Sequence, residues 1–548
     1  MNSPRIRTLV LTACAVLLGT AAGNSTISEQ KIRDHVRYLA SDELGGRAPG
    51  SPGEELAVAY ITEQLRAMDC EPGNPDGTWE QRVPLYGYTV TNRPTLAVRG
   101  LDDRTHDFIY GNEFVGWTLR QQARVAVDGA ELVFVGYGVD APEYGWNDYR
   151  GADVKGKVIV MLVNDPPLAD ASKFGGKAMT YYGRWTYKYE EAAAQGAAGA
   201  IIVHNTEDAG YPWAVVENSW SGEQFDVVRA DRGAKRCALE SWITEDAARA
   251  LFAMADRNFD REKAAAIAED FQPFALGLTA STVVESRSRT IESRNVVGKL
   301  TGTDPTLRDD FVIYTAHWDH LGIGKAADGD SIYNGALDNA SGVGGVIEIA
   351  RAFASNRESL KRSVLFMFTT GEESGLLGAT YYTENPLYPL TKTVAEINVD
   401  GLNIWGRTGD IVAIGYGKSN LDDVLAEAAA PEQRVIKPDA EPEKGGYYRS
   451  DHFPFAKQGV PALYADSGLE FRDRPRGWGM DRRREYVAER YHKPQDEYLD
   501  TWDLSGAAED METLYRVGHK VASSGIAIVW KDGSEFKRIR EAMLRDSK

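Results

Sequence analysis

Residues able to bind metal or transfer protons gather in the second half of this 548-residue chain, and several of them come just after a short, mostly apolar run. His317 follows the run at 311–316, Glu372 and Glu373 follow the run at 363–369, and Asp400 follows the run at 394–399. Such runs predict buried β-strands. When parallel strands lie side by side, the residues after their carboxyl ends meet in a common crevice. We therefore expect these side chains to form one site.

Two more segments supply residues of the same types. Asp338 lies in the turn at 334–342, which opens a predicted helix, and His492 lies in the segment 491–496. Imidazole and carboxylate ligands without thiolate suit Zn²⁺ or another divalent first-row metal, whereas sites built only from oxygen favour Ca²⁺ or Mg²⁺. Five ligands exceed the three that a catalytic zinc ordinarily takes from protein, but they suit two ions that share one bridging carboxylate.

Each of these residues has an ordinary structural explanation when it is taken alone. A histidine at a strand end is more often a hydrogen-bonded structural residue, and Glu-Glu pairs are common on exposed helices. Asp400 is harder to explain in this way, because an unpaired carboxylate that closes an apolar strand would lose its solvation. Their convergence on the strand ends of one α/β region favours a dinuclear metal site.

The surrounding pattern predicts an α/β fold. After residue 290, apolar strands alternate with helices, which is typical of a mostly parallel or mixed central sheet with helices on both faces. Amphipathic helices are expected at 29–39 and 53–68. Residues 93–288 predict a β-rich α+β module with no cluster of His, Asp and Glu, and we call them the inserted module. We assign residues 27–92 and 289–548 to the domain that it interrupts.

Composition restricts the functional classes. The chain has 62 basic and 81 acidic residues, and its net charge of −19 argues against a nucleic-acid partner. Its 43% hydrophobic and 26% charged residues are typical of a globular protein rather than a polytopic membrane protein. The sequence therefore predicts a globular protein with no integral membrane span, and no feature of it indicates an oligomeric state.

The first 22 residues predict a secretory signal peptide. Arg5 and Arg7 precede an apolar run at 9–18, and small residues follow at 19–22. The run is shorter than the ~20 residues that a membrane span needs. Cys14 sits in a sequence that resembles a lipoprotein cleavage box, so lipid anchoring is the alternative. We expect an exported protein, periplasmic or extracellular.

Together, these motifs resemble peptidase family M28, a family of dizinc peptidases. The resemblance covers residues 27–89 and 293–548. It is carried by His317-x-Asp319-His320, Gly335-Ala-x-Asp338-Asn339-x-Ser-Gly342, Gly371-Glu372-Glu373, Asn398-x-Asp400, Ser450-Asp451-His452 and Tyr491-His492. The inserted module resembles a protease-associated (PA) domain at 136–138, 156–158 and 192–203. In M28 enzymes that carry one, this domain holds no catalytic ligands and contributes to substrate access or binding.

The resemblance implies a zinc-peptidase fold and a set of metal ligands. His317 and Asp400 would hold one Zn²⁺, and Glu373 and His492 would hold the other. Asp338 would bridge the two ions. Other divalent first-row metals are possible with the same ligands.

The resemblance also implies roles for residues beside the ligands. Glu372 would act as the general base on a metal-bridged water and then as the acid to the leaving amine. Asp319 would accept the free imidazole N–H of His317 and so fix its tautomer. Tyr447 would stabilise the oxyanion, with the adjacent Tyr448 as an alternative. The remaining histidines of the motifs, His320 and His452, are expected to be structural.

Three functions follow from the resemblance. The first is an aminopeptidase that releases N-terminal residues from peptides or small proteins. The second is a carboxypeptidase or dipeptidase, in which a predicted arginine-rich loop from Arg472 to Arg484 clamps a substrate carboxylate. That loop is otherwise explained as a surface segment paired with the protein's own carboxylates. The third is an inactive, receptor-like binding protein. Known proteins of that class have lost metal ligands, whereas this sequence keeps all five predicted ligands, which argues against this function.

Overall fold

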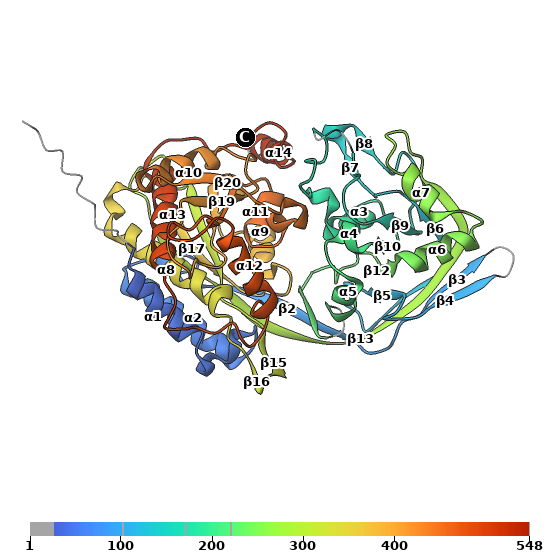
Figure 1. The fold of residues 1–548 in the computed structure, drawn as a ribbon, viewed down its shortest axis with the longest axis horizontal. Coiled ribbons are helices and arrows are strands. Elements are labelled where there is room, and N and C mark those ends of the chain that lie inside the picture. Colours follow the sequence, from blue (N-terminus) through green and yellow to red (C-terminus); the bar gives the residue numbers. More distant parts are fainter. Residues whose placement is uncertain (1–26, 101–103, 169, 171, 220–221, 547–548) are drawn as a thin grey trace, which may run out of the picture.

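The computed structural model describes residues 27–100, 104–168, 170, 172–219 and 222–546 (Figure 1). The predicted signal peptide at 1–22 and Cys14 lie outside these described residues. Among the helices of the described part of the chain, none combines the length and the apolar character needed to cross a bilayer.

The domain that carries the candidate site is built on a mixed sheet. Its strand order is β11-β2-β13-β17-β14-β18-β21-β19-β20. The strands are β2 (Glu80–Val90), β11 (Gln224–Val227), β13 (Phe274–Leu300), β14 (Phe311–His317), β17 (Ser363–Thr369), β18 (Thr393–Asn398), β19 (Asp410–Ile414), β20 (Val435–Pro438) and β21 (Ala462–Ser467). The central strands β17, β14, β18 and β21 run parallel. Every residue of β14 and β17 is buried, because both faces of a parallel sheet are covered.

Helices cover both faces of this sheet. One face shares a core with α1 (Glu29–Leu39), α2 (Pro52–Ala67), α8 (Gly342–Ser355), α10 (Leu421–Ala429) and α13 (Ser505–Ser523). The other face packs on α9 (Leu377–Glu384) and α11 (His452–Lys457). The predicted mixed sheet with helices on both faces is therefore confirmed. The C-terminal helix α14 (Lys537–Asp546) buries no residue.

The inserted module has a second sheet with two cores of its own. Its strand order is β5-β12-β10-β9-β6-β13-β3-β4. The strands are β3 (Leu96–Gly100), β4 (Thr105–Phe108), β5 (Phe114–Trp117), β6 (Arg124–Phe134), β9 (Val158–Leu162), β10 (Gly199–His204) and β12 (Leu239–Thr244). Helix α6 (Glu245–Met254) packs on one face and α3 (Trp185–Ala194) on the other.

Strand β13 joins the two sheets. Its first half pairs with β6 and β3 in the inserted module, and its second half pairs with β2 and β17. Figure 1 shows β2 and β13 running together between the two lobes. One continuous strand thus connects the sheet of the inserted module to the sheet that carries the site.

Candidate metal centre

Three neighbouring strands deliver the predicted residues to one edge of the sheet. Strand β14 ends at His317, which lies opposite Thr369 at the end of β17. Strand β18 pairs with the other side of β14 and ends two residues before Asp400. Because all three strands are parallel, the segments that follow them meet above the same edge.

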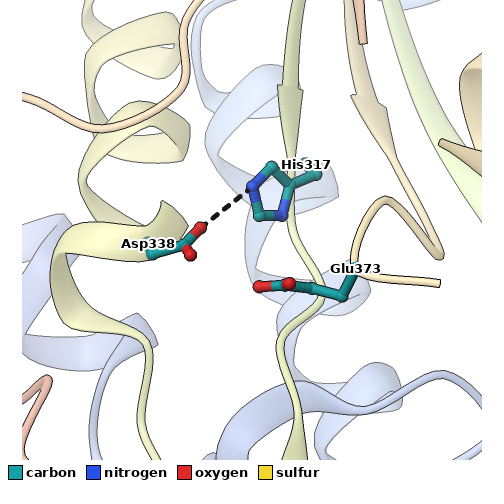
Figure 2. Close-up of side chains that lie close together, drawn as sticks. All are labelled: His317, Asp338 and Glu373. Atoms are coloured by element: carbon teal, nitrogen blue, oxygen red, sulfur yellow. Dashed lines mark ion pairs between the residues drawn. The ribbon is translucent and has the colours of Figure 1, made fainter. Parts of the chain in front are cut away.

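Asp338 lies between the two histidines. It belongs to the turn at 336–341 that leads into α8, and its Oδ1 is 3.2 Å from His317 Nε2 (Figure 2). Its other carboxylate oxygen, Oδ2, is 3.3 Å from His492 Nε2. The two oxygens of one carboxylate therefore face two different imidazoles, which is the arrangement that a bridging ligand requires.

Each histidine also faces a second carboxylate. His317 Nε2 is 3.2 Å from Asp400 Oδ1, and His492 Nε2 is 3.0 Å from Glu373 Oε2. Within the described residues, the ligand atoms of His317, Asp338 and Glu373 lie within 4.8 Å of one another, as do those of His317, Glu372 and Asp400. The structure brings together all five residues for which metal binding is predicted.

The chemistry of these donors fits divalent metal ions. The set consists of imidazole nitrogens and carboxylate oxygens, which suit zinc, and the two described cysteines are buried in other parts of the structure. His492 Nε2 is buried and makes no hydrogen bond to a described residue, although two carboxylate oxygens lie close to it. A nitrogen in that position is available to a cation held between the side chains.

Glu372 lies beside this cluster. Its Oε2 is 3.9 Å from His317 Nε2. Burial raises the pKa of Glu372 well above its ordinary value, and the carboxylates of Asp400 and Glu373 add to the rise, although the positive charge of His317 opposes it. A carboxyl group with a raised pKa can take up a proton from a reacting water and hold it.

Asp319 contacts both His317 and Glu372, but in a way that differs in part from the prediction. His317 Nδ1 is 3.1 Å from the backbone oxygen of Asp319, and the carboxylate of Asp319 is farther away, at 3.9 Å. The carboxylate instead accepts the backbone N–H of Glu372 at 3.1 Å. Burial raises the pKa of Asp319 to about 7. Asp319 therefore orients the imidazole through its backbone and the Glu372 segment through its side chain.

The predicted role of Tyr447 stays a prediction, and the structure places its side chain in an apolar cluster. The Tyr447 ring packs on His452 at 4.6 Å and on Phe536 at 6.0 Å, and its buried hydroxyl has no hydrogen-bond partner among the described residues. The neighbouring Tyr448 donates its hydroxyl to Glu535 at 3.0 Å. Both rings come from the short helix Gly446–Tyr448 and belong to one apolar cluster, and Tyr448 also lines the cavity described below. The Tyr447 hydroxyl is therefore enclosed by the protein, and the Tyr448 hydroxyl is bonded to Glu535.

Several residues that support the predicted ligands cannot be recognised as such from the sequence. Ser450 donates its hydroxyl to Asp400 Oδ2 at 2.6 Å and accepts a bond of 2.6 Å from Asn398 Nδ2. The Asp496 carboxylate accepts the backbone N–H of Leu337 and of Asp338. Ser450 and Asp496 both lie within the motif segments. Nothing in the spacing of those segments indicates which predicted metal ligand each of them contacts.

Two further residues of the motif segments contact the ligands directly. His320 Nδ1 lies 2.5 Å from Glu373 Oε1, so this histidine holds a ligand in place. The ring of Tyr491 stacks on His492, with 3.8 Å between the ring centroids. Tyr491 also lines the cavity described next, whereas Tyr447 is not among its described lining residues.

A cavity of about 860 Å³ opens over the metal centre. Asp338, Glu372, Glu373, Asp400 and His492 all line it. Its other wall comes from the inserted module, and the two sides are tied together by ion pairs from Lys457 to Glu190 at 2.6 Å and from Arg229 to Glu384 at 3.0 Å. A substrate in this cavity would touch both parts of the chain.

The arginine-rich segment from Arg472 to Arg484, predicted as a loop, is irregular only up to Gly477 and helical after it. Residues Trp478–Glu489 form helix α12, and Arg474 and Arg482 stack on Trp478. Most of its arginines pair with the protein's own carboxylates, namely Arg472 with Glu509, Arg482 with Glu485, Arg483 with Asp466 and Arg484 with Glu441. These contacts favour the surface-segment explanation over a carboxylate clamp built from this segment.

Comparison with known proteins agrees with the chemistry of the site. Residues 295–514 match the model of peptidase family M28. The chain contains an M28 peptidase domain. This M28 domain includes every residue for which metal binding is predicted.

The matches to individual relatives are shorter than the match to the family model. Aminopeptidase NAALADL1 of Mus musculus is 34% identical over 139 residues, which are 24% of this chain and 17% of the relative. A vacuolar membrane protease of Saccharomyces cerevisiae is 31% identical over 122 residues, 22% of this chain and 11% of the relative. The match therefore spans less than a fifth of these curated relatives. Among solved structures, the aminopeptidase from Aneurinibacillus sp. strain AM-1 has 21% identity and a TM-score of 0.49, with 92% of this chain and 96% of that chain covered.

Proposed function

We propose that this chain is a dinuclear zinc exopeptidase, and specifically an aminopeptidase. One observation carries the proposal: the two oxygens of Asp338 lie 3.2 Å and 3.3 Å from the Nε2 atoms of His317 and His492. In our assignment His317 and Asp400 would hold one Zn²⁺, Glu373 and His492 would hold the other, and Asp338 would contribute to both sites. Two-metal hydrolases hold their ions about 3.5–4 Å apart, a separation that a single carboxylate can span.

The chain's own residues would position substrate and move protons. Bound zinc would supply a Lewis acid that polarises the scissile carbonyl and lowers the pKa of water. Glu372 lines the cavity next to the ligands, and its raised pKa suits it to accept a proton and later return it to the leaving amine. Ser450 and His320 would keep Asp400 and Glu373 in place during that transfer.

The choice of aminopeptidase rests on relatedness within the M28 domain. The mouse relative, which is 34% identical over 139 residues, is named an aminopeptidase, and we extend that activity to this chain. We further propose that residues 27–92 and 289–548 form the peptidase domain and that the inserted module is a PA-like domain. Residues 1–22 would direct export, and peptides or small proteins would be the substrates.

The polarity of the exopeptidase is tested with blocked peptides. We expect the zinc-loaded protein to hydrolyse a peptide with a free N-terminus and to lose most of that activity when the N-terminus is acetylated. Product analysis by mass spectrometry identifies the released residue. Undiminished hydrolysis of the acetylated peptide would refute the aminopeptidase proposal and favour the carboxypeptidase alternative.

The role of Glu372 is tested by Glu372→Gln. This change removes the proton acceptor and keeps the size of the side chain, so turnover should fall by about 10²–10⁴-fold, the usual contribution of a general base. Zinc content and melting temperature should stay at the wild-type values. Glu358→Gln, at an exposed position outside the cavity, is the matched control. Substantial turnover by Glu372→Gln would remove Glu372 from this role.

A further inference from the structure

A row of buried polar side chains leads away from the metal centre into the protein. Strand β14 contributes Thr315, strand β18 contributes Glu396 and Asn398, and Ser450 comes from the segment before α11. Each of these four residues is at most 2% exposed. Hydrogen bonds join them to the predicted ligand Asp400, and we call the row from Glu396 to Asp400 the donor chain.

Four short distances define the donor chain. Ser450 Oγ lies 2.6 Å from Asp400 Oδ2, and Asn398 Nδ2 lies 2.6 Å from Ser450 Oγ. Thr315 Oγ1 lies 2.7 Å from Asn398 Oδ1 and 2.5 Å from Glu396 Oε1. The sheet fixes this arrangement, because Thr315 and Asn398 are paired residues of neighbouring strands. An unbroken path of hydrogen bonds therefore runs from Glu396 to Asp400.

The number of hydrogen atoms fixes the direction of each bond. An ionised carboxylate only accepts, so Ser450 must donate its single hydroxyl hydrogen to Asp400. Ser450 then accepts from the amide nitrogen of Asn398, which turns the amide oxygen toward Thr315. That oxygen also only accepts, so it takes the single hydroxyl hydrogen of Thr315. The remaining bond, between Thr315 and Glu396, contains a hydrogen only if Glu396 supplies it.

The surroundings of Glu396 favour a carboxyl group that keeps its hydrogen. Burial raises the pKa of Glu396 well above its ordinary value, the hydrogen bond with Thr315 opposes the rise, and the negative charge of Asp451 adds to it. Glu396 Oε2 is buried and has no hydrogen-bond partner in the described part of the protein. An unpaired oxygen costs less to bury when it belongs to a neutral carboxyl than when it carries charge.

From this hydrogen count we infer that Glu396 is a neutral carboxylic acid and that Glu396 and Thr315 are positioning residues for Asp400. The inference rests on the proposed function for one premise, that Asp400 is an ionised metal ligand. With Glu396 as the first donor, every hydrogen of the donor chain points toward Asp400, and Ser450 holds its Oδ2. The other oxygen, Oδ1, then stays beside His317 Nε2, 3.2 Å away, where we place the metal.

An ionised Glu396 would reverse the donor chain. It would take the hydroxyl hydrogen of Thr315, and the oxygens of Thr315 and Asn398 would then face each other at 2.7 Å with no hydrogen between them. Relief of that repulsion would require the amide of Asn398 to turn over. Its oxygen would then compete with Asp400 for the hydroxyl hydrogen of Ser450. The hold of Ser450 on Asp400 thus depends on the hydrogen that Glu396 keeps.

Infrared spectroscopy tests the neutral state of Glu396 without any turnover. A protonated carboxyl group has a C=O stretching band that an ionised carboxylate lacks. We expect the difference spectrum between the wild type and Glu396→Gln at pH 7 to contain one such band, because an ordinary glutamate is ionised at that pH. The control Glu358→Gln, at an exposed position, should give none. A Glu396 difference spectrum with only carboxylate bands would overturn the inference.

Substitutions test whether the donor chain controls a metal ligand. Thr315→Val keeps the shape and removes the hydroxyl, so the affinity of one zinc ion should fall about 5- to 10-fold, less than for a residue that contacts the ligand. Thr315→Ser and Glu396→Gln keep a donor and should stay within about twofold of the wild type. The matched control is Thr393→Val, because Thr393 is buried in β18 and its hydroxyl has no hydrogen-bond partner among the described residues. Unchanged zinc affinities in a folded Thr315→Val protein would overturn the inference.

The two readouts separate this inference from the proposed activity. A carboxyl band that disappears in Glu396→Gln, together with weaker zinc binding by Thr315→Val, supports the inference even if no peptide is hydrolysed and the proposed function fails. Zinc binding and aminopeptidase activity without a carboxyl band from Glu396 would refute the inference and leave the proposed function standing.

Discussion

Ser450→Ala tests whether the residues behind the ligands control metal affinity. The Ser450 hydroxyl donates to Asp400 Oδ2 at 2.6 Å and accepts from Asn398 Nδ2 at 2.6 Å. Ser450 is buried, so water cannot readily replace the missing hydroxyl. The substitution removes one hydrogen bond to the carboxylate of Asp400 and leaves the Asn398 N–H without its acceptor.

The expected loss follows from the strength of such a bond. A hydrogen bond to a charged group contributes about 1.5–3 kcal/mol, and a mid-range loss of about 2 kcal/mol corresponds to about 30-fold in affinity. This value lies within the 10- to 100-fold range typical for partners of metal ligands. Because Ser450 contacts Asp400 and none of the other four ligands, only one of the two zinc ions should bind more weakly.

The assay is a zinc titration in competition with a chelator of known affinity. In Ser450→Ala we expect the zinc affinity of one site to fall about 30-fold and that of the other site to stay within about threefold of its wild-type value. Ser355→Ala, which removes an exposed hydroxyl bonded to the Arg351 backbone, is the control and should change neither site. Two unchanged affinities in a folded Ser450→Ala protein would refute the reasoning, and so would equal weakening of both sites.

Two further predictions concern stability. Hydrogen bonds from Arg351 and the imidazole of His35, whose Nε2 lies 3.9 Å from Glu348 Oε1, outweigh burial and lower the pKa of Glu348 from 4.5 to about 2. This shift corresponds to about 3 kcal/mol of stability above pH 4.5. The free energy of unfolding of Glu348→Gln, measured in urea at pH 7, should therefore be about 3 kcal/mol lower than that of the wild type. This difference in unfolding free energy should shrink as the pH falls from 4.5 toward 2. A difference that grows on acidification would contradict the predicted direction of the pH dependence. The buried side chain of Arg47 donates to the backbone oxygens of Leu39, Trp318, Asn334 and Gly335. Arg47→Met should therefore lower the free energy of unfolding by at least about 3 kcal/mol in the same assay. A decrease below about 1 kcal/mol would contradict this structural role of Arg47.

The elements that position the metal ligands follow closely from the sequence. Apolar runs predict strands at 311–316 and 363–369, and the structure has β14 at Phe311–His317 and β17 at Ser363–Thr369. The amphipathic pattern at 29–39 likewise becomes α1 at Glu29–Leu39. These elements are predictable because a strand buried on both faces needs apolar residues at nearly every position, and a helix buried on one face needs them at regular intervals.

The path of β13, the helix α12 and the placement of Tyr447 and Tyr448 depend on contacts between distant parts of the chain, which no local sequence pattern predicts. The 27 residues of β13 pair with two sheets in turn, and their exposed middle lacks an apolar pattern. Helix α12 buries only Gly479 among its described residues, so nothing distinguishes its arginines from those of a loop. Tyr447 and Tyr448 are neighbours in the sequence, yet only Tyr448 donates its hydroxyl to Glu535 and lines the cavity.

The central claim is that Asp338 joins two zinc sites, and the zinc content of the purified protein tests it most directly. Elemental analysis after removal of loosely bound metal should give two zinc ions per chain for the wild type and fewer than two for Asp338→Asn, with both proteins folded by circular dichroism. A single zinc ion in the wild type would contradict the account, as would two ions held with unchanged affinity by Asp338→Asn.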